Sequence, residues 1–359
     1  MKIRSLAQVI VATLSIIPLA RAWDYEGHRM VNQVALASLP ADFPAFVRTA
    51  SNAERVAFLA GEPDRWRNVP DAIMRQSGGS WTDHFCDLEQ LTDAGLDFAT
   101  LPSLRFDFVV AFAAGRAAHL DKFPAIDPTK NTDHTREWPG FAPWTIDEYY
   151  TRLKSGFAYL KTFQENGGTP AEIANAEANI VYIMGVMGHF VGDCAQPLHT
   201  TVHHNGWVGP NPKGYGPAFT VNAAGQSVAS TIHSWIDGGF VGRAGISLAD
   251  LVPRVKPAAP ISIAARPDHR DPMFVAILDY LLAQNKLVEP LYAMDQAGKF
   301  RIEAGKPPTE EGRAFITGQL LKGGEMLGAL WLSAWRDAPV DTFLRGQLLK
   351  RQGTAPAAK

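Results

Sequence analysis

The chain has 359 residues, of which 46% are hydrophobic, so it is long enough to bury a substantial core in one large domain or two closely packed ones. It carries 34 basic and 36 acidic residues, a formal net charge of −2, and it has no basic tail or stripe. That balance argues against extended sequence reading of duplex DNA, which needs clustered positive charge. If the substrate is a polyanion, bound cations must supply the local positive charge.

The first 22 residues predict a secretory signal peptide. They begin with basic residues at positions 2 and 4, continue with an apolar stretch over 9–20, and end in the small-x-small pattern Ala20-Arg21-Ala22. The segment is too short and wrongly flanked to span a membrane. We therefore expect cleavage after Ala22 and a secreted or periplasmic protein with Trp23 at its N-terminus. Loss of the leader, which holds three basic and no acidic residues, shifts the net charge to −5.

The rest of the chain is predicted to be mostly helical, because its apolar residues recur at helical spacing and strand signals are few. Proline- and glycine-rich stretches separate the periodic segments. The expected helices span residues 23–40, 105–121, 146–165, 170–194, 273–298 and 309–335. We predict an all-α fold with a single domain over 23–351 and a disordered tail over 352–359.

The helix expected over 170–194 has the clearest ends. The sequence Thr-Pro-Ala-Glu at 169–172 supplies a cap and a proline in the first turn. Ile180 and Met187 belong to its apolar stripe, and Pro197 helps to end it.

Three stretches interrupt the helical pattern. Residues 122–145 hold four prolines and are expected to form a long surface loop. Residues 203–227, rich in Gly, Pro and Asn, are expected to form a small loop or hairpin insertion beside the functional site. Residues 243–272 are apolar and proline-rich, and the sequence assigns them no element.

Two His-x3-Asp pairs are the strongest chemical signal in the chain. His189 precedes Asp193, and His233 precedes Asp237, each by four residues, so an imidazole and a carboxylate share one helix face. Nitrogen and oxygen ligands without thiolates favour catalytic zinc, which keeps an open position for water. The complete set of candidate metal ligands is Trp23, His28, Asp64, His84, His189, Asp193, His199, His233 and Asp237.

Trp23 belongs to this set because signal-peptide cleavage would give it a free α-amino group. Such an amine has a pKa of about 7.7–8.0 and can lose its proton to a metal at neutral pH. Trp23 would then chelate zinc through its amine and carbonyl, and His28 would close the site. The other interpretation is a tryptophan packed in the core at the start of the domain.

In their order along the chain, these residues resemble the motifs of the secreted trinuclear-zinc single-strand nucleases, the nuclease S-one/nuclease P-one family within the zinc phospholipase C/nuclease superfamily. The matching motifs are Trp23-x4-His28, Asp64-x2-Arg67, His84-Phe85-Cys86-Asp87, Gly188-His189-x3-Asp193-x2-Gln196-Pro197-Leu198-His199 and His233-x3-Asp237. The longest motif is highly specific, whereas one His-x3-Asp pair alone is weak evidence. The resemblance implies a mainly α-helical phospholipase C/nuclease-like fold that binds three Zn²⁺.

The resemblance also implies which residues share each zinc. The groups are Asp64, His84 and His189 for one zinc, Trp23 and His28 for a second, and His199, His233 and Asp237 for the third, with Asp193 bridging the first two. Asp193 is therefore expected to be central to catalysis, because a bridged zinc pair lowers the pKa of a shared water towards neutrality. Arg67 is similar to the family's arginine and would act on charge at the phosphoryl oxygens. Its alternative role is a structural salt bridge to a ligand carboxylate.

Phe85 and Asp87 are the expected substrate-binding residues. In the family, the aromatic residue stacks on a base and the carboxylate accepts hydrogen bonds from it. A stacked base contributes about 1–3 kcal/mol and must first be unstacked, which selects single strands. The alternative is that Phe85 belongs to the core.

Cys86 and Cys194 are the only cysteines, and both lie beside proposed ligands. A secreted chain with two cysteines whose neighbours converge on one site is a candidate for a disulfide between them. The alternative is a pair of buried free thiols, because a bridge requires Cα atoms closer than about 7 Å.

The leading functional hypothesis is a secreted zinc phosphodiesterase that cleaves single-stranded RNA or DNA to 5′-phosphates, with 3′-nucleotidase action as an extension. The runner-up is a zinc-dependent phospholipase C acting on phospholipid. The Trp23-x4-His28 spacing and Asp237 favour the nuclease, because the lipase relatives have a longer first spacing and a Glu at the last position. A third hypothesis is a non-catalytic zinc-binding protein. We expect no stable protein partner and no transmembrane segment.

Overall fold

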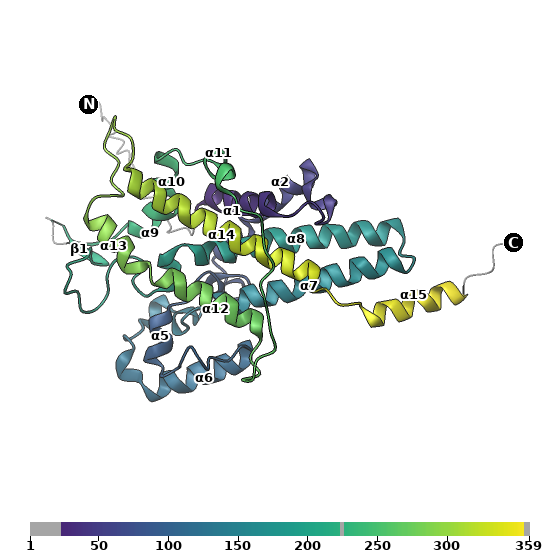
Figure 1. Cartoon of the computed structure of the whole chain (residues 1–359). Helices are drawn as coiled ribbons and strands as arrows, with labels where there is room; N and C mark the ends of the chain where they lie inside the picture. The colour runs from purple at the N-terminus through teal and green to yellow at the C-terminus, as the bar shows by residue number, and fades with distance from the viewer. Residues whose placement is uncertain (1–22, 223–225, 355–359) are drawn as a thin grey trace, which may run out of the picture.

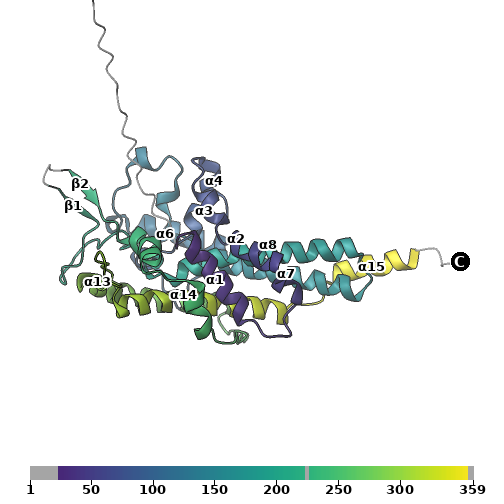
Figure 2. The same cartoon turned by 90° about the horizontal axis from the view of Figure 1, so that it is seen from above.

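Four helices pack on one another and carry a large share of the core (Figures 1 and 2). The computed structural model describes residues 23–222 and 226–354. These four helices are α1 (Tyr25–Ser38), α7 (Ala142–Glu165), α8 (Pro170–Ala195) and α14 (Glu310–Arg336). The buried apolar residues form one connected cluster that extends from Trp23 to Ala334.

The start of α8 follows from its sequence. The side chain of Thr169 accepts a hydrogen bond from the amide of Glu172 at 3.2 Å, and the Glu172 carboxylate accepts one from the amide of Thr169 at 2.8 Å. This capping box satisfies two amide groups that the first turn leaves without helical partners. The helix is then apolar to its end, where it carries the central His-x3-Asp pair. The boundaries expected for this helix are confirmed to within one residue.

The apolar character of α8 comes from its place in the core. By length and composition it could cross a membrane, but 78% of its most apolar window is buried inside the molecule. Within the described residues, no other helix meets those two criteria. The structure therefore uses α8 as the central helix of the fold.

A glycine allows α1 to approach α8 closely. The Asn32 amide donates hydrogen bonds to the carbonyl oxygens of Val56 (2.7 Å) and Gly185 (3.0 Å). A Cβ atom at Gly188 would overlap the Oδ1 atom of Asn32, so a larger residue there would push the two helices apart. Because His28 lies one turn before Asn32, this packing brings it to the C-terminal half of α8.

The other elements surround these four helices. The remaining α-helices are α2 (Ala50–Leu59), α3 (Glu62–Arg67), α4 (Ala72–Gln76), α5 (Leu88–Asp93), α6 (Arg105–Ala118), α9 (Ile232–Ser234), α10 (Phe240–Arg243), α11 (Leu248–Leu251), α12 (Pro272–Asn285), α13 (Val288–Gln296) and α15 (Thr342–Thr354). The 3₁₀ turns are η1 (Ala45–Arg48), η2 (Trp81–Asp83), η3 (Leu120–Lys122), η4 (Pro128–Lys130), η5 (Thr135–Glu137), η6 (Pro197–Thr200) and η8 (Val252–Arg254), and η7 (Trp235–Gly239) is a π-helical turn.

One small antiparallel hairpin accompanies the helices. Strand β1 (Phe219–Val221) pairs with β2 (Ser227–Ala229), so that Phe219 lies opposite Ala229. The expectation of a mostly helical chain with a small hairpin insertion near 203–227 is thus confirmed, with the second strand at the end of that range and just beyond it.

Several boundaries differ from the sequence-based expectation. The helix expected over 273–298 is two helices, α12 and α13, because Pro290 in the first turn of α13 cannot donate the hydrogen bond that would continue α12. Helix α7 begins at Ala142 rather than at 146, and residues 141–146 are buried. The prediction that the surface loop extends to residue 145 was therefore wrong.

The start of the expected C-terminal tail also differs from the prediction. The tail expected from residue 352 is helical to Thr354, because α15 packs on α7 and its Arg351 forms an ion pair with Glu172 at 3.0 Å. Residues 355–359 of the expected tail lie outside the described residues. The expected signal peptide over 1–22 also lies outside them.

Candidate metal centre

Eight of the nine predicted ligands offer imidazole or carboxylate groups, and the structure brings all eight together at one end of α8. They come from several elements. His28 lies on α1, Asp64 on α3, and His189 and Asp193 on the last turns of α8. His84 follows η2, His199 lies in η6, and the final pair bridges α9 and η7. Three groups of these side chains have ligand atoms within 4.8 Å of one another: His28, Asp64 and His189; His84, His189 and Asp193; and His199, His233 and Asp237.

Asp193 lies between two sets of histidines. Its Oδ1 atom is 3.3 Å from His28 Nε2, while its Oδ2 atom is 3.1 Å from His84 Nδ1 and 3.2 Å from His189 Nε2. Each carboxylate oxygen therefore faces a different imidazole group. This is the arrangement that a carboxylate shared by two cations requires.

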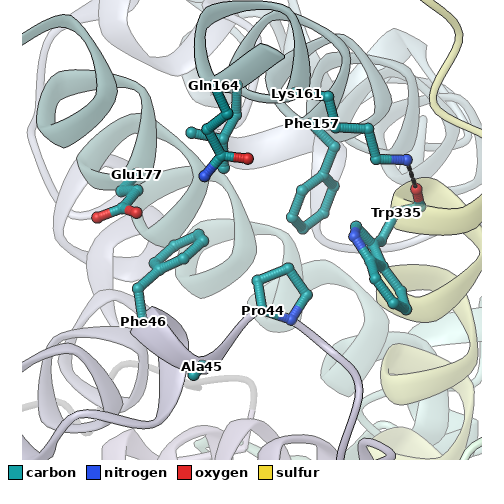
Figure 3. A pocket seen from close by; sticks show the side chains of 9 residues that line it. Pro44, Ala45, Phe46, Phe157, Lys161, Gln164, Glu177 and Trp335 are labelled. Carbon is teal, nitrogen blue, oxygen red and sulfur yellow. Dashed lines mark hydrogen bonds between the residues drawn. The ribbon is translucent and has the colours of Figure 1, made fainter. Parts of the chain in front are cut away.

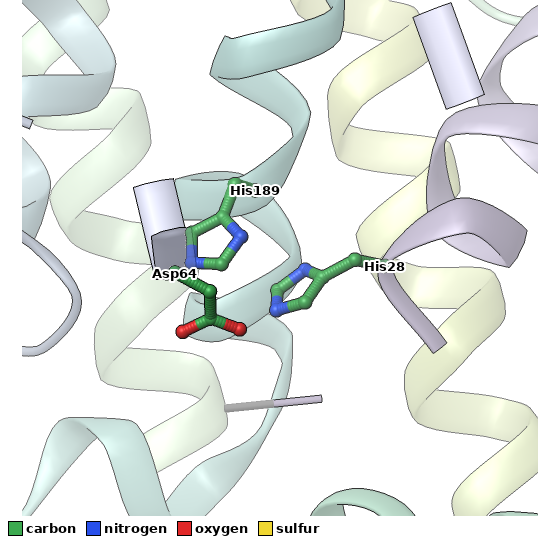
Figure 4. Close-up of side chains that lie close together, drawn as sticks. All are labelled: His28, Asp64 and His189. Atoms are coloured by element: carbon green, nitrogen blue, oxygen red, sulfur yellow. The ribbon is translucent and has the colours of Figure 1, made fainter. Parts of the chain in front are cut away.

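The first two groups share His189, which makes them contiguous. Its ring is stacked on that of His28, with centroids 3.9 Å apart, and Asp64 lies beside both (Figure 4). The resemblance implied that Asp64 shares a zinc with His84 and His189, but in the structure Asp64 is grouped with His28 and His189 instead. The shared histidine places all five side chains around one small volume.

Backbone carbonyl oxygens orient two of the histidines. His189 Nδ1 donates to the carbonyl of Ala60 at 2.7 Å, and His199 Nδ1 donates to the carbonyl of His84 at 2.9 Å. Since a carbonyl oxygen only accepts, these contacts place the proton on Nδ1 and leave Nε2 as the free lone pair in a neutral ring. Such outer hydrogen bonds are the usual support of metal-binding histidines.

The third group is held by the π-helical turn. His233 Nε2 lies 3.1 Å from Asp237 Oδ2 and 3.0 Å from His199 Nε2. The Gln196 amide donates to the other carboxylate oxygen of Asp237 at 2.6 Å, which fixes that side chain. Single π-helical turns occur often at functional sites, because the wider turn redirects the side chains that follow.

The spacing of these atoms fits metal binding. Two ligands of a tetrahedral zinc, each about 2.0–2.1 Å from the ion, lie roughly 3.3 Å apart. The closest pairs of nitrogen and oxygen atoms in the centre are separated by 2.8–3.3 Å, and His199 lies 3.9 Å from Asp193 and 4.0 Å from Asp237. Neither Asp193 Oδ1 nor either ring nitrogen of His28 makes a hydrogen bond to any described residue, although both side chains are fully buried. Because buried polar atoms are normally satisfied, these residues fit a bound cation.

The electrostatics of the centre point the same way. Burial lowers the pKa of His28 and of His84 to about 4, so both rings are neutral at pH 7 and can coordinate a metal. Burial raises the pKa of Asp193, but the attraction of His189 and His199 outweighs it and holds that pKa well below its usual value. Burial also lowers the pKa of His189 and His199, but the attraction of Asp193 outweighs it, so the pKa of His189 is raised and that of His199 is raised to about 9. A metal that binds at these two rings therefore displaces protons, whereas His28 and His84 are already neutral.

Trp23 is fully buried beside the centre. Its indole Nε1 donates to the carbonyl of Gly192 at 2.8 Å, which ties the residue to α8 next to Asp193. The side chain is therefore part of the core, as the second interpretation held. The expected coordination through a free amine depends on removal of residues 1–22, which lie outside the described residues.

Arg67 reaches from α3 to the centre. Its Nη2 atom lies 3.1 Å from Asp64 Oδ1, and its guanidinium carbon is 5.7 Å from the centre of the Trp81 ring. It also lines the cavity described next. The ion pair to a candidate ligand and the position at the cavity are both present, so the two expected roles are compatible.

A cavity of about 420 Å³ opens directly beside the candidate ligands. Its lining includes His84, His199 and His233 from the candidate metal centre, together with Phe85 and Asp87. Phe85 is half-buried and faces this cavity, so the interpretation that it belongs to the core was wrong. Burial and the nearby Glu89 raise the pKa of Asp87 to about 8.

Several cavity residues were not assigned to the site from the sequence. They are Trp81, Gln90, Thr135, Arg136, Trp138, Leu198, His204 and Asn205. Two backbone hydrogen bonds join the segment that carries Trp138 to the Phe85 segment. The Asp87 amide donates to the carbonyl oxygen of Pro139 at 2.6 Å, and the Ala142 amide donates to that of Phe85 at 3.2 Å. Gly140, with φ +97°, permits this approach, since a Cβ atom there would overlap the Phe85 carbonyl.

The expected disulfide between Cys86 and Cys194 is not formed, so this prediction was wrong and the alternative of buried free thiols holds. Both residues are fully buried, and burial raises the pKa of both thiols far above the ordinary value. Other contacts already fix their positions, because the Cys86 amide donates to the carbonyl of His199 at 2.9 Å and Cys194 lies within α8.

A second cavity, of about 440 Å³, lies near the other end of α8 (Figure 3). It is lined by Phe46, Phe157 and Trp335, and Lys161 Nζ donates to the carbonyl of Trp335 at 2.7 Å. Glu177 at its edge precedes His189 by three turns of α8, roughly 18 Å along the helix axis. This cavity is therefore remote from the candidate ligands.

Comparison of the chain with protein-family models, with curated proteins and with solved structures finds no match. The functional argument therefore depends on the motifs and on the geometry of the centre.

Proposed function

We propose that this protein is a zinc-dependent phosphodiesterase, secreted or periplasmic, that hydrolyses single-stranded RNA or DNA to 5′-phosphorylated products and also acts as a 3′-nucleotidase. In this proposal the fold is of the phospholipase C/nuclease type and the centre binds three Zn²⁺. The observation that carries it is Asp193, whose two oxygens face separate histidine groups within 3.3 Å, directly beside a cavity with an aromatic wall.

The metals would be held by the side chains of the candidate centre. Two zinc ions would be held by His28, Asp64, His84, His189 and Asp193, and a third by His199, His233 and Asp237. Zinc bound here would supply a nucleophile from water at neutral pH and positive charge for the phosphoryl oxygens. A hydrolytic rather than a storage role is supported by the open cavity, since a storage site would be closed by four protein ligands.

The side chains around the cavity would position the substrate. Arg67 presents guanidinium N–H groups to a phosphate placed beside the cations, and Asp64 fixes the direction of its side chain. Phe85 would offer one ring face to a base. Asp87 accepts a hydrogen bond from Gln90 at 3.1 Å, and these two side chains would offer polar groups to the edge of that base. The base must leave its duplex stack to enter, which accounts for a single-stranded substrate.

The zinc-dependent phospholipase C remains the second candidate, because of one specific observation. Helix α6 packs against the cavity-lining segment through Phe112 and Trp138, with ring centroids 6.1 Å apart, yet its outer face exposes Phe106 and Val110. Exposed apolar side chains of this kind are suited to a lipid surface.

One assay separates these functions. The processed protein is incubated with a single-stranded oligonucleotide, with the same sequence as a duplex, and with phosphatidylcholine vesicles. The proposal expects fast cleavage of the single strand, slow cleavage of the duplex, and 5′-phosphate ends. Activity on the vesicles alone would replace the nuclease by the phospholipase, and full zinc content without any turnover would favour the non-catalytic protein.

A further inference from the structure

Two adjacent histidines in the segment after η6 have different surroundings. The ring of His203 is stacked on Trp207, with centroids 4.0 Å apart and planes 6° apart, and its Nδ1 atom accepts a hydrogen bond from the amide of Val208 at 3.1 Å. The ring of His204 instead lines the cavity beside the third candidate cation group, 5.9 Å from the ring of His233. Of these two histidines, only His204 is therefore in a position to contact a substrate bound in the cavity.

The hydrogen bonding of His204 defines what it can recognise. Its Nδ1 atom lies 3.2 Å from the carbonyl oxygen of Thr201. Because a carbonyl oxygen cannot donate, Nδ1 carries the proton, and Nε2 of the neutral ring is a hydrogen-bond acceptor. The ring nitrogen of His204 that remains for a substrate is thus an acceptor, and its partner must be a donor.

The cavity also indicates which part of a nucleotide lies near His204. Phe85 and Asp87 line the cavity and suit a base, while His199 and His233 line the same cavity and belong to the cation group that suits a phosphate. A nucleotide whose base lies on Phe85 and whose phosphate lies at the cations places its sugar between them, and His204 lines the cavity beside that cation group. In a nucleic-acid strand both O3′ and O5′ are esterified, so the 2′-hydroxyl of RNA is the only donor on the sugar, and DNA has none.

We propose that His204 accepts a hydrogen bond from the ribose 2′-hydroxyl of the nucleotide whose O3′ leaves, so that the enzyme prefers RNA to DNA at this position. This inference rests on the proposed nuclease function. It assigns His204 a part in substrate specificity and leaves the candidate metal ligands unchanged.

The test uses one DNA oligonucleotide with a single variable sugar on the 5′ side of one phosphate. That sugar carries a 2′-hydroxyl, a 2′-fluorine or a 2′-hydrogen. The 2′-fluoro sugar keeps a ribose-like pucker but has no donor, so it separates the hydrogen bond from the shape of the sugar. Cleavage at that phosphate is scored only as product with a 5′-phosphate, which excludes attack by the 2′-hydroxyl itself.

Four proteins are compared by kcat/KM at that phosphate: the parent, His204→Ala, His204→Gln and His203→Ala. The parent is expected to cleave the 2′-hydroxyl substrate roughly 3- to 10-fold faster than the 2′-fluoro one, the range of one neutral hydrogen bond. His204→Ala should lose this ratio and keep its rate on the other two substrates. His204→Gln, whose amide oxygen can accept, should keep part of the ratio, and His203→Ala should match the parent.

The outcomes that would overturn the inference are distinct. An equal loss on all three substrates in His204→Ala would show a structural role, and an unchanged ratio would show no contact with the 2′-hydroxyl. A lower zinc content in His204→Ala, measured on the same samples, would make it a metal ligand instead. If the parent cleaves none of the oligonucleotides, the proposed nuclease function fails together with this inference.

Discussion

Asp193 Oδ1 and His28 Nε2 lie 3.3 Å apart inside the protein, and neither atom makes a hydrogen bond to any described residue. One belongs to the last turn of α8 and the other to the first turns of α1, so the packing of these two helices creates the pair. Two buried polar atoms at the ligand–ligand distance of zinc, without other partners, are best satisfied by a shared cation.

The first prediction concerns this carboxylate. Asp193→Asn replaces a charged group that offers two equivalent oxygens by a neutral amide that offers one. We expect the variant to lose two of the three zinc ions, since both groups depend on Asp193, and to lose more than about 10³-fold in kcat. Elemental analysis and kcat are measured on the same preparation. Asp107→Asn, at an exposed position on α6, is the control and should keep both values.

A variant of Asp193 that retains three zinc ions and the parent rate would remove the bridging assignment. A variant that loses zinc without losing rate would show that the metals are structural.

The second prediction concerns Arg67. If its guanidinium donates to the phosphoryl oxygens, Arg67→Ala should lower kcat by about 10²-fold or more while the zinc content and the thermal midpoint stay near those of the parent. Arg67→Lys should recover only part of the rate, because an ammonium group lacks the planar pair of donors. An Arg67→Ala variant with normal kcat and reduced stability would assign the residue to the Asp64 ion pair alone.

Arg65 on the same helix provides the matched control. Its ion pair with Glu62 at 2.6 Å is exposed, and exposed pairs contribute about 0–1 kcal/mol. Arg65→Ala should therefore change neither kcat nor zinc content.

The sequence was sufficient to find the two His-x3-Asp pairs of the candidate centre because their spacing is local. His189 and Asp193 lie one turn apart on a helix whose cap, proline and apolar stripe are all visible in the sequence. The pairing of groups across the fold was less visible: Asp64 meets His28 and His189 only because α3 and α1 both pack on α8. Such contacts depend on tertiary packing, which no local pattern encodes.

The wall of the cavity was predicted only in part. Phe85 and Asp87 were found through the family resemblance, which assigns substrate binding to these positions after a candidate ligand. Trp138 was not assigned to the site, because it lies in a proline-rich stretch whose backbone pairs with the Phe85 segment only in the folded chain. The disulfide was predicted because each cysteine lies beside a candidate ligand in the sequence, and those ligands converge on one site. Convergence of the neighbouring ligands does not by itself bring the two thiols into bonding geometry.

The third prediction concerns base stacking. Phe85→Ala should raise KM for a single-stranded substrate by about 5- to 100-fold, the equivalent of roughly 1–3 kcal/mol, without changing zinc content. Phe106→Ala, on the exposed face of α6, should leave KM for nucleic acid unchanged. The stacking role is wrong if Phe85→Ala binds nucleic acid as well as the parent. A loss in Phe106→Ala confined to lipid vesicles would support the phospholipase alternative.

The fourth prediction concerns stability and pH, at a site away from the metals. Burial and the nearby Asp271 raise the pKa of Asp147 to about 7. The folded protein therefore holds a proton that the unfolded chain releases near pH 4, so this contribution to stability is complete below about pH 4 and is lost as the pH rises through 7. Asp147→Asn should raise the free energy of unfolding at pH 8 by about 1–3 kcal/mol.

The same substitution should have little effect at pH 4, where Asp147 is neutral in both states. Denaturant unfolding at the two pH values, with Asp107→Asn as the exposed control, measures the difference. Equal effects at pH 4 and pH 8 would show that burial does not hold the proton on Asp147.

The most direct test of the whole account is the zinc content of the processed, fully active protein, measured together with activity during removal of the metal. The account predicts three zinc ions per chain, loss of single-strand cleavage in excess chelator, and recovery when zinc is returned. Full activity with fewer than three ions per chain, or unchanged activity in excess chelator, would contradict it.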